Sequence, residues 1–261
     1  MSKYCRTFLL SIKNIHLFKL DFYLSFIAIP IQILVTYFFW RRLNLSESSR
    51  LITVNSLLIY YFVMGILQIS FGSAMYVTYE LWQEINQGTI ITWLNRPIYY
   101  PLYVFAQKIA QFLMNFLASL VITFTVFWFV GYHFAIITFL IGILSSLLGF
   151  LLLFQIQFII GTLTFWLKKV IVLRDTIMSL LFLLGGFVLP IDLTPQIIQR
   201  LSFFTPTPYI YYLPTKILSG QTTDLNLPML LCVQLFWVML LQAILMLAWH
   251  YGSHDHVTQG A

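Results

Sequence analysis

The stretch that decides the fold class is IITFLIGILSSLLGFLLLF, residues 136–154, which carries no charged side chain and no alternation of polar and apolar residues. A helix rises about 1.5 Å per residue, so about 20 apolar residues cross the roughly 30 Å of a bilayer's hydrocarbon core. A strand of a membrane β-barrel would instead alternate over about ten residues. Because backbone groups in lipid must be satisfied within the segment, this stretch predicts a transmembrane helix.

Comparable apolar runs recur along the chain. Hydrophobic residues make up 60% of the sequence and charged residues only 8%, against about 45–50% and about 25% in soluble domains. We therefore predict an all-α integral membrane protein whose residues 1–261 form a single transmembrane domain with six transmembrane helices. The predicted spans are about 22–40, 51–79, 103–130, 135–166, 171–189 and 227–249.

Three segments outside these spans have their own patterns. Residues 2–20 are amphipathic and lack the uninterrupted apolar region and the cleavage site of a signal peptide, which predicts an interfacial helix. Residues 80–97 form an amphipathic polar junction between two spans. Residues 190–220 are moderately apolar and rich in proline, so they cannot form one continuous helix, and short re-entrant or interfacial helices are expected there. A polar tail follows the last span.

The formal net charge of +6 does not indicate nucleic-acid binding. The basic residues lie at the ends of apolar runs, where Lys and Arg set membrane topology. A cytoplasmic N-terminus places most of them inside, although the pair Arg41 and Arg42 then lies outside. With an even number of spans, the C-terminus is also expected in the cytoplasm.

The acidic residues argue against an ion-coupled carrier, because all eight fall at predicted helix ends or in loops. A proton- or sodium-coupled carrier usually needs a carboxylate inside the membrane. The chain also lacks a glycine-rich phosphate loop ending in Lys-Ser or Lys-Thr, so it does not bind ATP in the usual way. The energy for transport is therefore expected from a partner protein.

The junction 80–97 is the predicted docking element for that partner. Glu80 and Glu84 lie one helical turn apart, while Trp82 and Ile85 supply an apolar side. An ordinary interfacial loop helix is the alternative interpretation. The predicted docking residues are Glu80, Trp82, Glu84, Ile85 and Gly88.

Other polar residues favour structural roles. Three histidines near the C-terminus, His250, His254 and His256, do not make a convincing metal site, and no metal site is predicted. Gln155 and Gln157 lie inside a predicted span. We favour a role in hydrogen bonds between helices over a role in lining a transport pathway.

Two other functional classes remain open. A membrane-bound acyl- or glycosyltransferase would need a positioned acid or base, but Asp192 and His133 have no nucleophile–base pattern around them. A channel is also possible, although no filter motif is present.

The order of three motifs resembles ABC-2 type permeases, the six-span membrane subunits of bacterial ABC exporters, over essentially the whole chain. The first motif is INQGTIITWLNRPI, residues 85–98. The second is GGFVLPIDLTP, residues 185–195, continued by PTPYIYYLP at 206–214. The third is KILSG, residues 216–220.

The resemblance implies that residues 80–97 form a coupling helix received by a cytoplasmic ATPase, and that the N-terminal segment is a connecting helix. It also implies extracellular re-entrant helices with a gate, and the residues carried over to them are Gly185, Gly186, Pro190, Pro195, Pro206, Pro208 and Pro214.

Two ATP-binding subunits and a second permease chain, identical or related, are the implied partners, in addition to membrane lipid. ATP and Mg²⁺ would bind the ATPase and no cofactor would bind this chain, which is not itself an enzyme. The implied location is the bacterial cytoplasmic (inner) membrane. The expected cargo is a hydrophobic or amphipathic molecule, such as a drug-like compound, a lipid or a glycan.

Overall fold

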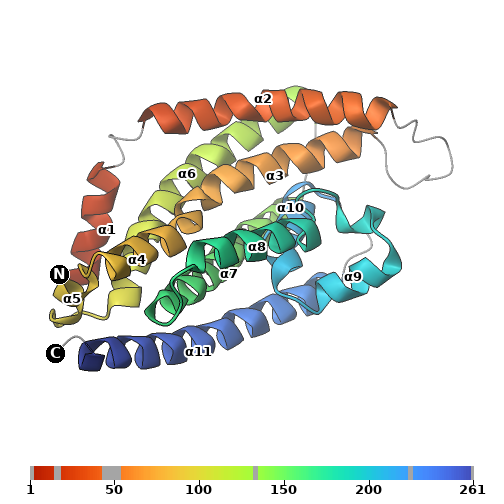
Figure 1. Ribbon diagram of the computed structural model, residues 1–261. Helices are drawn as coiled ribbons and strands as arrows, with labels where there is room; N and C mark the ends of the chain where they lie inside the picture. Colours follow the sequence, from red (N-terminus) through yellow and green to blue (C-terminus); the bar gives the residue numbers. More distant parts are fainter. Residues whose placement is uncertain (1–2, 15–18, 43–53, 132–134, 223–225, 260–261) are drawn as a thin grey trace.

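The computed structural model describes residues 3–14, 19–42, 54–131, 135–222 and 226–259, and every regular element within these ranges is a helix (Figure 1). The longer helices are α1 (Lys3–Asn14), α2 (Lys19–Arg42), α3 (Val54–Met75), α4 (Val77–Asn86), α6 (Tyr100–Val130), α7 (Ile136–Thr162), α8 (Val170–Leu184), α9 (Gln196–Phe203) and α11 (Leu227–Gln259). The shorter ones are α5 (Ile90–Leu94), η2 (Leu163–Phe165), η3 (Ile191–Leu193), η4 (Thr207–Tyr209) and α10 (Tyr212–Leu218).

Four helices of the described chain are long and apolar enough to cross a membrane, namely Val54–Asn86, Tyr100–Phe129, Ile136–Phe165 and Leu227–His254. The protein is therefore a multi-pass membrane protein with an all-helical fold. The predicted span 22–40 coincides with α2, which has 24 residues. The predicted span 171–189 coincides with α8, whose 15 residues extend only about 22 Å.

Several helix boundaries differ from the sequence-based expectation. The span predicted to end at residue 79 has its helical break earlier, at Tyr76, and α4 then continues to Asn86. The predicted last span ended at residue 249, but α11 continues to Gln259 through the expected polar tail. Apolar length alone does not mark these ends, because a helix continues through polar residues as long as its backbone hydrogen bonds persist.

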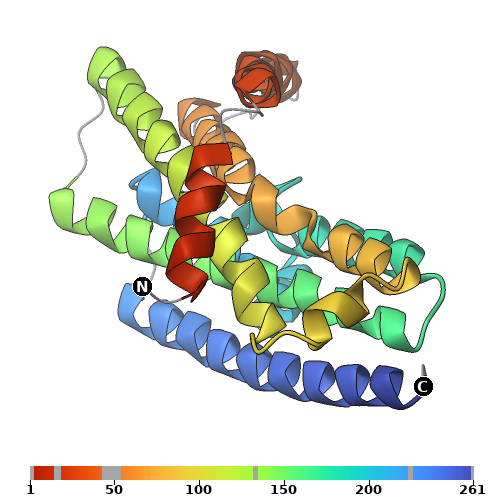
Figure 2. The same ribbon diagram turned by 90° about the vertical axis from the view of Figure 1, so that its left-hand side faces the viewer.

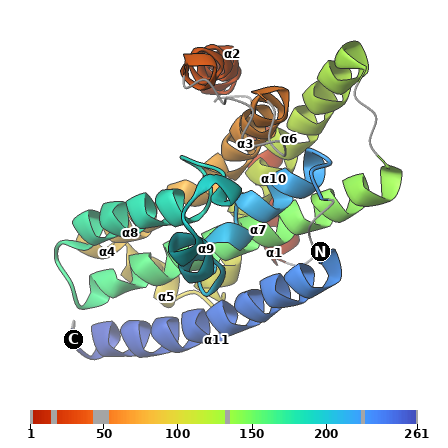
Figure 3. The same cartoon turned by 90° about the vertical axis from the view of Figure 1, so that its right-hand side faces the viewer.

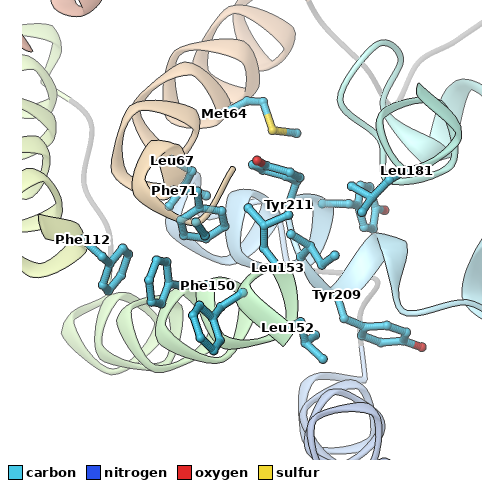
Figure 4. Packing of buried hydrophobic residues seen from close by; sticks show 14 of the residues in the cluster. Met64, Leu67, Phe71, Phe112, Phe150, Leu152, Leu153, Leu181, Tyr209 and Tyr211 are labelled. Carbon is cyan, nitrogen blue, oxygen red and sulfur yellow. The ribbon is translucent and has the colours of Figure 1, made fainter. Parts of the chain in front are cut away.

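The core lies where α3, α6, α7 and the segment before α11 meet (Figure 4). Phe71 of α3 packs between the stacked rings of Phe112 and Phe150 on one side and Tyr211 on the other. At Gly149, α7 approaches the backbone of Ile210 so closely that only glycine fits, because an added Cβ would lie 2.6 Å from the Ile210 backbone oxygen. The proline-rich segment is thus seated directly on α7.

Polar residues inside the bundle bond between helices. Gln155 Nε2 donates to the Val238 carbonyl at 3.2 Å and to Gln242 Oε1 at 2.9 Å, which joins α7 to α11. Gln157 bonds with Thr78 of α4 and donates to Met178 Sδ of α8 at 3.0 Å. Both glutamine side chains therefore connect helices, as favoured from the sequence.

Candidate functional site

The segment α4–α5 lies at one end of the bundle, beside the N-terminal helix α1 and the C-terminal part of α11 (Figures 1 and 2). We call this the α4–α5 end. Here α4 continues from α3 after a break at Tyr76, which we call the α3–α4 joint. Helix α4 packs against α7 and α8, so the segment belongs to the bundle and is not a detached loop.

Glu80 is fixed by a cation from the neighbouring helix. Its Oε1 atom lies 2.6 Å from Nζ of Lys108 on α6. The Lys108 side chain is only 8% exposed, whereas that of Glu80 is 46% exposed. Because a buried ammonium group is costly without a partner, Glu80 serves as the counter-ion that allows Lys108 to be buried.

Glu84 also points into the bundle. Its Oε2 accepts a hydrogen bond of 2.6 Å from the hydroxyl of Tyr100 at the start of α6. The Tyr100 ring stacks on Trp249 of α11, with centroids 5.2 Å apart and an interplanar angle of 15°. Trp249 also contacts Phe158 of α7 and Phe165 of η2. The carboxylate therefore ties α4 to an aromatic cluster formed by four other elements, α6, α7, η2 and α11.

The remaining predicted docking residues have mixed positions. Ile85 is buried together with Leu81, and Trp82 is half-buried. Gly88 has φ +71°, the left-handed conformation that glycine adopts without strain, and it turns the chain from α4 into α5. The docking role of the five residues stays a prediction, but three of them have side chains turned toward the protein.

The outward side of the segment is made by other residues. Gln83, Gln87, Ile91, Thr92 and Asn95 are exposed, and we call them the α4–α5 tip. Ile91 is apolar and 43% exposed. The sequence-based prediction chose the acidic residues of α4 as docking residues and passed over the tip, whereas in the structure Lys108 and Tyr100 engage both carboxylates.

Helix α1 rests on α6 next to this segment (Figure 2). Lys3 Nζ donates to the carbonyl of Pro97 at 3.3 Å, and the hydroxyl of Tyr4 accepts the backbone N–H of Tyr99 at 2.9 Å. Leu9 and Leu10 are exposed. The amphipathic N-terminal helix thus contacts the end of the predicted coupling segment directly.

The proline-rich segment includes α9, which lies at the opposite end (Figure 1) and faces the viewer in Figure 3; we call this the α9 end. Gly186 has φ +76°, and its carbonyl accepts the hydroxyl of Tyr60 at 2.7 Å. A Cβ at Gly185 would lie 2.5 Å from the carbonyl oxygen of Leu181. The hydroxyl of Tyr61 donates to the Val188 carbonyl at 2.9 Å, so two tyrosines of α3 hold the turn that follows α8.

The five prolines of the predicted gate are divided between the surface and the interior. Pro190, Pro208 and Pro214 are buried, Pro206 is partly buried and Pro195 is exposed. Each interrupts or begins a short helix, in agreement with a segment that is not one continuous helix.

One ion pair closes the α9 end. Asp192 Oδ2 lies 2.5 Å from Lys216 Nζ, and Asp192 Oδ1 accepts the hydroxyl of Tyr212 at 2.5 Å. Burial and the neighbouring Asp192 carboxylate raise the pKa of Tyr212, so its hydroxyl remains a donor. Both oxygens of Asp192 are therefore engaged in structural bonds.

The described residues contain no group of three His, Cys, Asp or Glu that could hold a metal ion. His133 and the side chain of His256 lie outside what the structure describes. Asp192, which we weighed as the acid or base of a transferase, forms an ion pair with Lys216 and accepts a hydrogen bond from Tyr212.

Comparison with known proteins supports one family. No curated protein matches the chain. The model of the ABC-2 family transporter proteins matches residues 31–260, nearly the whole sequence. Proteins of this family are membrane subunits for transport and generally work with ATP-binding subunits. The match covers the α4–α5 segment, the proline-rich segment and the four described helices that are long and apolar enough to cross a membrane, and the chain belongs to the ABC-2 transporter family.

Proposed function

We propose that this chain is the permease subunit of an ATP-driven exporter and that a separate ATPase docks at the α4–α5 end. The observation that carries the proposal is the α4–α5 segment itself. It is anchored to α6, α7 and α8 through its buried side, is linked to α11 through the ring of Tyr100, and presents an exposed tip. Because the segment is attached to several helices, a force applied to its exposed tip displaces those helices together.

The distribution of basic residues supports a cytoplasmic location for this end. Lys3, Arg6 and Lys13 of α1 are exposed, as are Lys168 and Lys169 before α8. Lys and Arg near the ends of membrane helices favour the cytoplasmic side. Both termini are then cytoplasmic, α2 and α8 complete the six spans, and the membrane is the bacterial inner membrane.

Residues 190–220 are proposed to form re-entrant helices at the outer face, with the gate formed by the glycines and prolines carried over from the family. Ile197, Leu201 and Phe204 are 74%, 57% and 80% exposed. They lie three or four residues apart, so they form one apolar stripe along α9 and the residue that follows it, Phe204. Such a stripe fits a helix that dips into lipid, which agrees with a position at the membrane surface.

The interior chemistry favours a hydrophobic or amphipathic cargo, such as a drug-like molecule, a lipid or a glycan. The buried cation Lys108 is neutralised by Glu80, and Gln155, Gln157 and Gln234 are engaged in bonds between elements. We propose that two permease chains, identical or related, form the pathway at their interface and that two ATPases drive it with ATP and Mg²⁺.

The test is affinity purification of the chain in mild detergent, with mass spectrometry of the proteins that remain bound. A stoichiometric nucleotide-binding subunit is expected, and the variant Ile91→Glu should lower its recovery without lowering membrane insertion. Repeated absence of an ATPase from the wild-type preparation would contradict the proposal and favour a membrane enzyme or a channel.

Transport is then measured after the purified complex is reconstituted in vesicles. Ethidium and an NBD-labelled phospholipid serve as amphipathic probes, and rubidium serves as a small hydrophilic ion. ATP-dependent movement of an amphipathic probe is expected. A strong preference for rubidium would reject the proposed cargo class.

A further inference from the structure

Arg174 on α8 reaches the α3–α4 joint. Its Nη2 atom donates a hydrogen bond of 2.6 Å to the carbonyl of Met75, the last residue of α3. The contact joins residues that are 99 positions apart in the sequence. A cation at a helix C-terminus is stabilised by the helix dipole and by the carbonyls that end the helix.

The geometry of the guanidinium group suits a clamp. Nη1 lies 2.8 Å from Asp175 Oδ1, so the fork is held by a carboxylate on one side and by a carbonyl on the other. The Arg174 side chain is 23% exposed, and its Nε atom is buried. The planar guanidinium group can donate to two acceptors at once. The ammonium group of a lysine would reach both acceptors with poorer geometry.

The same two helices are also linked at their other ends. Tyr60, near the start of α3, donates to the carbonyl of Gly186, just beyond the end of α8. Helix α8 is thus fastened to α3 at the joint with α4 and again at the α9 end. Because α4 and α8 also pack against each other, a displacement of α4 reaches α8 through both packing and the Arg174 contact.

We propose that Arg174 is a positioning residue for transport. By binding the α3–α4 joint it makes α8 follow the coupling segment, so that a movement of α4 reaches the Gly185–Gly186 turn and the proline-rich segment beyond it. This inference rests on the proposed function, because it assumes that an ATPase moves α4.

The contact is tested first in the chain alone. In a background with Cys5→Ser and Cys232→Ser, spin labels at Gln83→Cys on α4 and Thr176→Cys on α8 report their distance in nanodiscs. Both sites are exposed. Arg174→Ala should broaden and shift the distance distribution, Arg174→Lys should have an intermediate effect, and the exposed control Lys169→Ala should have none. An unchanged distribution in Arg174→Ala would overturn the clamp.

The transport role is tested in the reconstituted complex with its copurified ATPase, as ethidium or NBD-phospholipid moved per ATP hydrolysed. Arg174→Ala should retain ATP hydrolysis and lose transport per ATP by about fivefold, the lower range of typical coupling between sites. Asp175→Asn should show a smaller loss, because its carboxylate is 61% exposed and only orients the fork. If Arg174→Ala does not fold, Arg174→Lys provides the same test with partial rescue.

The outcomes separate the two proposals. ATP-driven transport by the wild type with an unchanged transport-to-hydrolysis ratio in the Arg174 variants would reject the role of Arg174 and keep the proposed function. Absence of ATP-driven transport by the wild type would reject the proposed function and the transport role together, while the spin labels would still decide whether Arg174 holds the joint.

Discussion

The two ends of the molecule are attached to the bundle by similar groups but in different ways. At the α4–α5 end, a helix that continues from α3 is held by the Lys108–Glu80 pair and by the Tyr100–Glu84 hydrogen bond. At the α9 end, short helices are held by the Lys216–Asp192 pair and by tyrosine hydroxyls on backbone carbonyls. The α4–α5 end is thus the continuation of one long helix, whereas the α9 end is a set of short helices joined to the bundle by separate contacts.

Glu80→Ala should have the largest effect on stability, because it leaves the buried ammonium of Lys108 without a partner. Breaking such a pair costs about 3 kcal/mol or more. Thermal unfolding in detergent measures the effect, with the exposed Gln83→Ala on the same helix as control. If Glu80→Ala lowers ATPase recovery at unchanged stability, Glu80 contacts the partner and is not an internal anchor.

Gly149→Ala should loosen the α9 end. The added Cβ would lie 2.6 Å from the backbone oxygen of Ile210, which cannot rotate away, and overpacking of this kind costs about 2 kcal/mol. Gly72→Ala on α3 is the matched control, since nothing lies within 4 Å of its added Cβ. Equal stability of the two variants would show that η4 does not depend on close seating against α7.

Asp192→Asn should destabilise the α9 end by about 1 kcal/mol, the upper range for a pair that is partly exposed to solvent. The Asp192 side chain is 35% exposed and that of Lys216 is 14% exposed. Limited proteolysis between residues 190 and 205 should become faster while cleavage at the α4–α5 end is unchanged. Faster cleavage at both ends would show that Asp192 stabilises the whole bundle and not the α9 end in particular.

Tyr60→Phe removes only the hydroxyl that donates to Gly186 and should cost about 1 kcal/mol or less. Tyr61→Phe is the comparison, because the hydroxyl of Tyr61 donates to the carbonyl of Val188 in the same turn. Hydrogen exchange at Phe187 and Val188 is the measurement. No change in either variant would mean that packing alone holds the turn.

Ile91→Glu at the α4–α5 tip should leave the unfolding temperature unchanged, because Ile91 is 43% exposed and does not belong to the buried hydrophobic core. Its expected effect is on ATPase recovery alone. Thr92→Ser, at the adjacent exposed position, serves as the conservative control. A loss of stability in Ile91→Glu would indicate that the tip belongs to the folded core.

Family and fold class could be predicted from the sequence, but the orientation of the docking residues could not. The apolar run at 136–154 indicates a membrane helix without knowledge of its neighbours, and the order of the three motifs indicates the family, which the match over residues 31–260 confirms. The prediction for the docking residues treated α4 as an isolated amphipathic helix. It did not include Lys108 and Tyr100, which lie 28 and 16 residues from their partners.

The sequence by itself determined that the chain is helical and resides in lipid, because the apolar length and the backbone's need for internal hydrogen bonds are local properties. It also determined that residues 190–220 are broken into short helices, because proline cannot donate a backbone hydrogen bond. Only the tertiary structure decided that Glu80 pairs with Lys108, that Glu84 bonds with Tyr100 and that Arg174 holds the α3–α4 joint. These choices depend on which distant cation, hydroxyl or carbonyl lies within about 3 Å, and that is a property of packing between helices.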